Sequence, residues 1–270
     1  MRDLVRRRWP VVLVAGWSVL LLVLAVIAAG GDATVAAQRG IAESRTAMDK
    51  ATIELVNAVG GEAAVRVGRF DFVADCEISV VRDGVTYRRL VELYPEPGGE
   101  QRLMQSLVRR LPAAYRTKLF RHRGTPRISG HADPYLPLTG SARDGVVRIE
   151  IATECHPPDG PVQTFRTPPT PAERAELAEV LELTGGVERK PQWRTEAIAC
   201  GTGDAELRAV TLAVTPAPDR ALADAADLAP PDAQVLARGT GLLAYRRGAV
   251  SVVAEARGGT LTLTTTTVRC

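Results

Sequence analysis

The chain has 270 residues, 46% of them hydrophobic, and a formal net charge of +3. That length and apolar content suffice for two domains with separate cores. The weak positive charge argues against a nucleic-acid-binding protein. Nearly all of the 34 basic residues are arginines. Codon bias in GC-rich genomes, such as those of actinobacteria, explains this preference better than a function specific to arginine.

The N-terminus carries a targeting signal. A basic tail, residues 1–10, precedes an almost unbroken apolar run, residues 11–31. As a helix this run would be about 31 Å long, which matches the hydrocarbon core of a bilayer. Basic residues before a membrane helix stay cytoplasmic. We therefore expect a single-pass protein of the cell membrane, with residues 1–10 inside, a transmembrane helix over 11–31 and the bulk of the chain outside.

A cleaved signal peptide is the alternative to this uncleaved signal anchor. Val35-Ala36-Ala37 could serve as the small-residue cleavage site. The apolar run is long for a signal peptide, which favours the anchor. A lipoprotein would need a cysteine directly after the apolar run, but the first cysteine is Cys76.

The remaining chain contains the same pattern twice. A helix-like run ends at Gly60-Gly61 and is followed by Cys76, and a second such run ends at Gly185-Gly186 and is followed by Cys200. A Pro-x-Pro segment comes later in each copy, and each copy closes on a second cysteine. A period of this length indicates two sibling domains.

The duplication predicts the domain boundaries. After a juxtamembrane segment, residues 32–42, we expect one extracytoplasmic repeat over 43–155 and a second over 170–270. The segment 156–169 between them is rich in proline and poor in apolar residues. Such composition is typical of a semi-rigid linker.

The first repeat should begin with a helix over 43–59. Ile41, Met48 and Leu55 recur every seven residues, so this helix could form a coiled-coil stalk. Packing on the first domain is favoured, because the second repeat has a similar helix and no membrane stalk to build. That second helix, 171–184, has Thr170 as its N-cap and Glu173 at the position that completes a capping box.

Strands follow the first helix of each repeat. In the first repeat, Phe70, Phe72, Ala74, Cys76 and Ile78 alternate with mostly polar residues, which predicts that they face inward. Asp83-Gly84 is a typical hairpin turn. In the second repeat the corresponding strand covers 193–200.

A central helix comes next. In the first repeat it ends at Pro112 and presents one apolar face, formed by Leu103, Met104, Leu107, Val108 and Leu111. In the second repeat it covers 219–228. Residues 121–142 of the first repeat are rich in glycine and proline, and we interpret them as a long insertion. The final strands are expected over 147–155, 241–246, 249–256 and 260–268.

These elements predict an α+β protein: an N-terminal transmembrane helix followed by two homologous domains. Each domain would be an antiparallel sheet of four or five strands with two helices on one face and one internal disulfide. The duplication selects the pairs Cys76–Cys155 and Cys200–Cys270. Four reduced thiols are the alternative, but thiols of exported domains oxidise. One detail does not fit, because Cys270 has the strand parity of Thr262, Thr264 and Thr266.

The sequence contains no catalytic or cofactor-binding motif, so we predict no catalytic, cofactor-binding or metal-binding residues and no cofactor. Cys155-His156 lacks a second ligand pair at zinc spacing. Asp71 and Asp75 fall on the outward face of their strand, where a solvated surface explains them.

One basic segment is a candidate anion-binding loop. Arg121, His122, Arg123 and Arg127 lie within the glycine- and proline-rich insertion. They could bind an anionic polymer, lipid head groups or an acidic protein of the envelope. An ordinary exposed loop is the alternative.

Together these features favour a membrane-anchored, non-enzymatic module that binds or scaffolds other components of the bacterial envelope. We expect the membrane, and an envelope protein or an anionic polymer or lipid, as partners, and no nucleic acid. The alternative is a hydrolase-like enzyme acting on envelope polymers. It would need a pocket that collects two or more of five dispersed residues: Asp71, Asp75, His122, His131 and Glu150. Nothing in the sequence predicts an oligomeric state.

Overall fold

The computed structural model describes residues 14–24, 40–79, 82–158, 168–183, 192–200, 205–215 and 229–270. The chain divides into two compact units, residues 1–38 and 39–270. In the first unit, residues 14–24 are helical. Within the described part of the chain, no helix has both the length and the apolar character needed to cross a bilayer. The rest of the expected membrane segment, the basic tail and most of the juxtamembrane segment lie outside the described residues.

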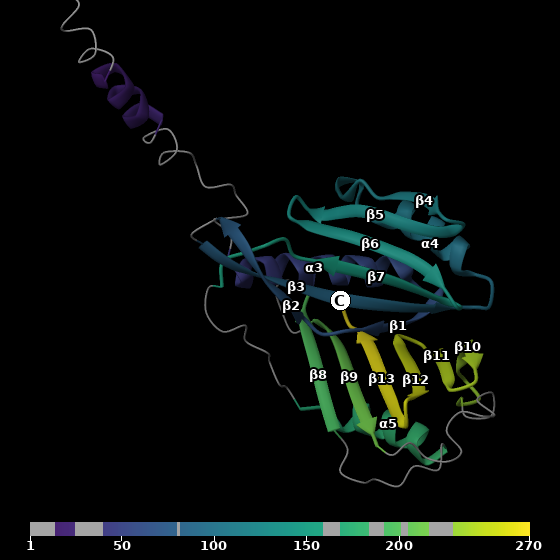
Figure 1. Ribbon diagram of the computed structural model, residues 1–270. Coiled ribbons are helices and arrows are strands. Elements are labelled where there is room, and N and C mark those ends of the chain that lie inside the picture. Colours follow the sequence, from purple (N-terminus) through teal and green to yellow (C-terminus); the bar gives the residue numbers. More distant parts are fainter. Residues whose placement is uncertain are drawn as a thin grey trace, which may run out of the picture. The chain divides into compact units, whose positions relative to one another are not determined.

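The second unit contains a first sheet, which the described strands show as seven-stranded and antiparallel (Figure 1). Its order is β1-β3-β7-β6-β5-β4, and β2 pairs with β3 beyond the end of β1. The strands are β1 (Ala63–Val67), β2 (Asp71–Ser79), β3 (Arg82–Pro95), β4 (Lys118–His122), β5 (Thr125–Asp133), β6 (Leu136–Arg143) and β7 (Val146–Ala152).

A second sheet, with six described strands, is also antiparallel and has the order β10-β11-β12-β13-β9-β8. Its strands are β8 (Gln192–Ala199), β9 (Glu206–Val214), β10 (Gln234–Gly239), β11 (Leu242–Arg247), β12 (Val250–Arg257) and β13 (Thr260–Val268). The final three agree with the sequence-based prediction, whereas β10 was not foreseen.

The two sheets have the same connectivity. The two orders match when β1 and β2 are counted as one interrupted strand. The first sheet then has the order β1/β2, β3, β7, β6, β5, β4, and the second has the order β8, β9, β13, β12, β11, β10. The protein is therefore α+β, with two sheets that repeat one arrangement. The expected four or five strands per sheet were too few. The supposed insertion at 121–142 is wrong, because these residues end β4 and form β5 and β6, the counterparts of β10, β11 and β12.

Helices cover one face of each sheet. In the first half, α3 (Ile41–Val59) and α4 (Glu100–Arg110) contact strands β3, β5 and β7. Met48, Leu55 and Leu107 are fully buried in the shared core, because the apolar residues of both helices recur on one side. The helix 43–59 therefore packs on its sheet, and the coiled-coil alternative is wrong. The short 3-10 helix η1 (Ala113–Tyr115) follows Pro112.

In the second half, α5 (Pro171–Leu183) packs against β13. Its capping box is formed as predicted. The Thr170 N–H donates to Glu173 Oε2 at 2.7 Å, and the Glu173 N–H donates to Thr170 Oγ1 at 3.3 Å. The predicted helix at 219–228 and the Gly185-Gly186 turn lie outside the described residues.

Both predicted disulfide pairs are present. Cys76 is bonded to Cys155 and Cys200 to Cys270, with Cα atoms 6.0 and 5.5 Å apart. The parity of Cys270 is no obstacle, because both Cys200 and Cys270 follow the last residues of their strands.

The expected hairpin is present as the antiparallel pair of β2 and β3, but its turn is not at Asp83-Gly84. Glu77 pairs with Asp83 and Cys76 with Gly84, so both residues lie within the ladder of β2 and β3. A Cβ atom on Gly84 would come within 2.5 Å of Cys155 Sγ and 3.0 Å of the His156 carbonyl oxygen. Glycine is needed here for the close approach of the disulfide rather than for a turn.

The expected inward face of β2 is also wrong in part. Phe70 is buried, but Phe72 is 52% exposed and Ala74 is exposed as well. The register shifts between Phe72 and Ala74, and such a bulge breaks the alternation of faces on which the prediction depended.

The helix-free face of the second sheet is covered by the first half. Strand β1 contacts β11, β12 and β13, and α3 contacts β8. As a result, Ile198, Leu207 and Ala209 join the core of the first half. A smaller cluster joins Ala64, Tyr94 and Val146 to residues of β10, β11 and β12. The boundaries predicted for the two repeats stay a prediction, since residues 39–270 pack as one unit.

Candidate functional site

The predicted basic loop is a hairpin at the edge of the first sheet. Arg121 and His122 end β4, Arg123 and Gly124 form the turn, and Arg127 lies in β5. The φ angles of Arg123 and Gly124 are 50° and 81°, and positive values at both central residues match the twist of a two-residue hairpin. All four predicted residues are exposed.

The hairpin does not bring these four residues to one face. Arg127 pairs with Phe120 and alternates with the buried Ile128, so it projects from the helix-free face. Arg121 lies on the helix side, where its guanidinium donates to Gln101 Oε1 of α4 at 2.6 Å. The predicted residues therefore flank one sheet edge instead of forming a compact anion-binding loop.

The positive charge extends beyond the predicted residues. Residues 101–132 contain eight Lys or Arg residues and two His but no Asp or Glu, so the other residues of the chain have 26 Lys or Arg against 31 acids. This segment forms α4, η1, β4 and most of β5. We call its basic residues the basic edge: Arg102, Arg109, Arg110, Arg116, Lys118, Arg121, Arg123 and Arg127.

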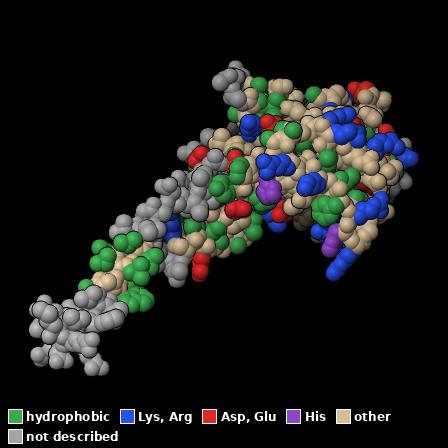
Figure 2. Space-filling view, turned by 90° about the horizontal axis from the view of Figure 1, so that it is seen from above, with side chains coloured by type: hydrophobic (Ala, Val, Ile, Leu, Met, Phe, Trp, Pro, Cys, Tyr) green, Lys and Arg blue, Asp and Glu red, His purple; other side chains and the backbone are tan. Residues whose placement is uncertain are grey.

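The basic edge is scarcely neutralised within the molecule. Among the residues that the structure describes, only Arg110 of the eight forms an ion pair, with Glu62 at 2.6 Å. In Figure 2, which looks down on β4, β5 and β6, Lys and Arg side chains are spread over the surface together with histidine. Five of the eight lie in or beside β4 and β5, whereas Arg102, Arg109 and Arg110 on α4 line a pocket that also contains Glu62 and Glu96. Unpaired cations around β4 produce a local positive field that attracts anionic partners.

The opposite edge of the same sheet is acidic. Strand β2 contains Asp71, Asp75 and Glu77 and no basic residue. Asp71 pairs with Arg69 at 2.9 Å, whereas Asp75 and Glu77 form no ion pair with any residue that the structure describes. Beyond its ladder with β3, β2 has no described partner strand.

Exposed apolar side chains mark the same two edges. In the described part of residues 39–270, the large hydrophobic side chains that remain exposed are Phe72, Val73 and Phe120. The first two lie on β2 and the third on β4. Single exposed hydrophobics are ordinary, but here all of them lie on the two terminal strands of one sheet.

A polar cleft of about 320 Å³ lies between the helix-free faces of the two sheets. Arg66, Arg69 and Arg194 line it together with hydroxyls of the second sheet, Thr211, Thr262 and Thr264. Of the five residues on which the enzyme alternative depends, the cleft contains Asp71 alone. His131 and Glu150 lie on β5 and β7, with β6 between them.

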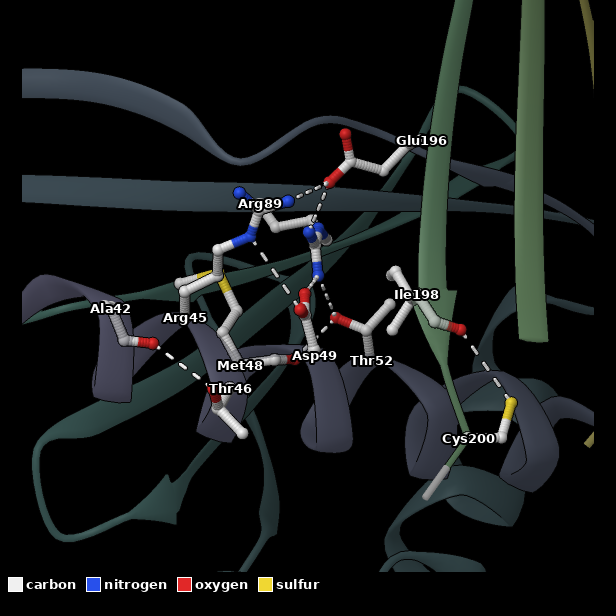
Figure 3. A network of polar contacts seen from close by, with 10 residues as sticks. All are labelled: Ala42, Arg45, Thr46, Met48, Asp49, Thr52, Arg89, Glu196, Ile198 and Cys200. Atoms are coloured by element: carbon white, nitrogen blue, oxygen red, sulfur yellow. Dashed lines mark hydrogen bonds and ion pairs between the residues drawn. The ribbon is translucent and has the colours of Figure 1, made fainter. Parts of the chain in front are cut away.

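A buried charge network joins the two halves beside this cleft (Figure 3). Arg89 is fully buried and donates to Asp49 of α3 at 2.6 Å and to Glu196 of β8 at 2.7 Å. It also donates to the Thr52 hydroxyl at 3.2 Å, and Arg45 lies 3.7 Å from Glu196. Buried charges are tolerated only when paired, so the network holds β8 against α3 and β3.

A second charge cluster crosses the same junction. Arg66 of β1 bonds to Glu92 of β3, and also to Glu255 of β12 at 2.7 Å. Burial by itself would lower the pKa of Arg66, but nearby Tyr94, Glu92 and Glu255 raise it above its ordinary value. For the neutral hydroxyl of Tyr94, burial has the opposite effect and raises the pKa. Both networks bind charged side chains of the two halves to one another.

No group of three metal-ligating side chains occurs among the described residues. Cys155 is in a disulfide, and the adjacent His156 is buried and bridges to Val85 through its backbone. Compared with protein-family models, curated proteins and solved structures, the chain gives no match. Its function therefore has to be inferred from its own geometry.

The prediction from the sequence did not include most residues of the basic edge, such as Arg116 and Lys118. The sequence feature that could have revealed these residues is the absence of Asp and Glu over 101–132. The prediction also missed the exposure of Phe120, which depends on β4 being the last strand of the sheet.

Proposed function

We propose that the protein is a non-enzymatic binding or scaffolding module of the bacterial envelope, held outside the cell by an N-terminal membrane helix. In this proposal it consists of two homologous repeats. The basic edge of the first repeat is the surface that engages an acidic partner.

The two disulfides support an extracytoplasmic location, because such bonds persist mainly in oxidising compartments. The anchor is supported by the basic tail and the apolar run over 11–31. A reporter fused after Cys270 should be active only outside the cytoplasm, and the intact chain should resist carbonate extraction. Release of a fragment beginning near Gln38 would contradict the anchor.

The observation that carries the binding role is the unpaired charge of the basic edge. Seven of its eight cations have no ion pair among the described residues, so no internal pair has to be broken before they contact an anion. A merely solvated surface would carry both signs of charge, as the rest of this chain does.

Binding can be tested with two defined probes, immobilised polyglutamate and vesicles containing phosphatidylglycerol, using the detergent-solubilised full chain. We expect salt-sensitive binding to at least one probe, because exposed charges are screened within about 8 Å at physiological ionic strength. Lys118→Glu with Arg127→Glu should weaken it about tenfold. The matched control, Arg238→Glu with Arg257→Glu, reverses two exposed arginines of the second sheet. Equal binding by both variants, or no binding by the wild type, would overturn the proposal.

A further inference from the structure

We infer that copies of this chain assemble head to tail, with the acidic edge strand β2 of one copy pairing with the basic edge strand β4 of the next. This inference rests on the proposed function, because it identifies the acidic partner of the basic edge as a second copy of the chain. It commits to a protein edge rather than to a lipid surface.

Both strands offer unpaired backbone groups. Strand β4 is the terminal strand of the first sheet, and β2 is bonded only to β3 in the described structure. An extended strand can add to such an edge through main-chain hydrogen bonds. The five residues of β4 can be accommodated along the nine residues of β2.

The charges of the two edges specify which pairing is allowed. Strand β2 has three acids and no base, whereas β4 has Lys118 and Arg121 and no acid. Opposite charges across a strand pair are stabilising, and like charges are destabilising. Pairing of β2 with β2, or of β4 with β4, would therefore be repelled, and the mixed pairing is favoured.

The exposed apolar side chains point to the same two strands. Phe72 and Val73 on β2 and Phe120 on β4 are 52%, 45% and 45% exposed. Mixed pairing would bring an exposed phenylalanine to each side of the new ladder and remove apolar surface from water. Charge and apolar exposure are independent observations, and both select β2 and β4.

The symmetry of such a contact has a consequence for the assembly. Each copy uses two different surfaces, so the contact does not close on itself and builds a row or a ring rather than a simple dimer. In the proposed topology the anchors hold all copies in one plane, which raises their effective concentration at the membrane.

The test uses the full chain in two labelled populations, reconstituted into vesicles of neutral phosphatidylcholine, with energy transfer between labels as the readout. One variant makes both edges basic, by Asp75→Lys and Glu77→Lys. The other makes both edges acidic, by Lys118→Glu and Arg121→Glu. We expect wild-type energy transfer that falls with salt, and association about tenfold weaker for either variant alone.

Mixing the two variants tests directly whether complementary edges restore association. A copy with two basic edges is complementary to a copy with two acidic edges at both contacts, so the mixture should regain wild-type association. Matched far-ultraviolet spectra and intact disulfides on non-reducing gels establish that each variant is folded. Arg238→Glu with Arg257→Glu serves as the control and should associate like the wild type.

Two outcomes would overturn the inference: wild-type chains that do not associate, or a mixture that is not restored although both variants are folded. If wild-type chains stay apart but bind phosphatidylglycerol vesicles through Lys118, lipid occupies the basic edge instead. In that case the proposed binding function stands and the head-to-tail contact fails. If the wild-type chain bound neither polyglutamate nor phosphatidylglycerol vesicles, the proposed function itself would be wrong.

Discussion

The two halves of the folded unit share one strand order but differ in what covers their helix-free faces. In the second sheet this face is packed against β1 and α3, and Ser251, Thr264 and Thr266 on it are buried. In the first sheet, only the part of this face around Ala64 and Tyr94 shares that contact, and Arg127, Ser129 and Thr139 farther along the face are exposed. Repetition of a connectivity therefore does not repeat a surface. Position in the tandem decides which face becomes core and which stays available for partners.

Removal of the disulfides tests how alike the halves are, and it has the largest expected effect. The two bonds close similar lengths of chain, since their cysteines are 79 and 70 residues apart. In the chain-entropy account each should stabilise the fold by about 4 kcal/mol. We expect Cys76→Ser with Cys155→Ser, and Cys200→Ser with Cys270→Ser, to lower the free energy of unfolding by similar amounts in urea titrations. A difference above about 2 kcal/mol would show that the halves are not equivalent.

Substitution of Arg89 tests the buried charge network that joins β8 to α3 and β3. Replacing Arg89 by alanine leaves Asp49 and Glu196 without their buried partner, and breaking a buried pair in this way costs about 3 kcal/mol. The neighbouring Arg88 is a matched control, because its pair with Glu150 is exposed and longer, at 3.4 Å. Arg88→Ala should cost under about 0.5 kcal/mol. Urea unfolding of both variants measures the difference, and equal costs would contradict the role of the network.

Glu173 gives the second half a dependence on pH. Burial would raise the pKa of Glu173, but hydrogen bonds from Arg208 and Thr170 outweigh it and hold the pKa below its ordinary value. A carboxyl with a lowered pKa stabilises the fold above its unfolded pKa, and this contribution is lost as the pH falls through the folded value.

We therefore expect Glu173→Gln to lower the free energy of unfolding by about 1.5 kcal/mol at pH 7. The gap from the wild type should shrink steadily as the pH falls below 4.5, the ordinary pKa of a glutamate. Thermal melts of both proteins from pH 3 to pH 7 would reveal this convergence. A gap that widened in acid would mean that the pKa is raised instead.

Phe120 should have the smallest effect on stability, and it sharpens the contrast between open and covered surfaces. Its side chain is 45% exposed on the edge strand, so Phe120→Ala should change the free energy of unfolding by about 0.5 kcal/mol or less. Its effect should be found in association of the full chain, which we expect to weaken. A loss of stability above about 1.5 kcal/mol would show that Phe120 belongs to the core.

The elements that sequence reasoning predicted well are those with strong periodicity or chemistry. The face of α4 formed by Leu103, Met104 and Leu107, the capping box of Thr170 and Glu173, and both disulfide pairs are present as expected. In each case the signal is local, or the duplication supplies the missing long-range information.

The strands β5 and β6 were missed because their glycines and prolines have tertiary causes. A Cβ on Gly130 would come within 2.8 Å of Thr117 and of the Tyr115 carbonyl oxygen. Pro126 and Pro137 are each the second residue of their strand, where a missing N–H is tolerated. A loop and a crowded strand have the same composition, and only the neighbours of each residue distinguish them.

The candidate site shows the same limit. The cluster of basic residues around Arg121 was visible in the sequence, but its division between two faces follows from the register of β4 and β5. The acidic counterpart on β2 could not be recognised as an edge, because edge position depends on which strands pair, and these pairs join distant segments.

The charged junction also bears on how the chain is made. Residues up to 158 leave the ribosome before Glu196 and Glu255, so for a time Arg89 and Arg66 have only Asp49 and Glu92 of the first half as partners. During that interval the surface awaiting β8 and β12 contains guanidinium groups that water can hydrate. Nascent chains aggregate mainly through exposed apolar surface, and these arginines interrupt it. A junction made partly of charge thus exposes less apolar surface than a wholly apolar one while the second sheet is still missing.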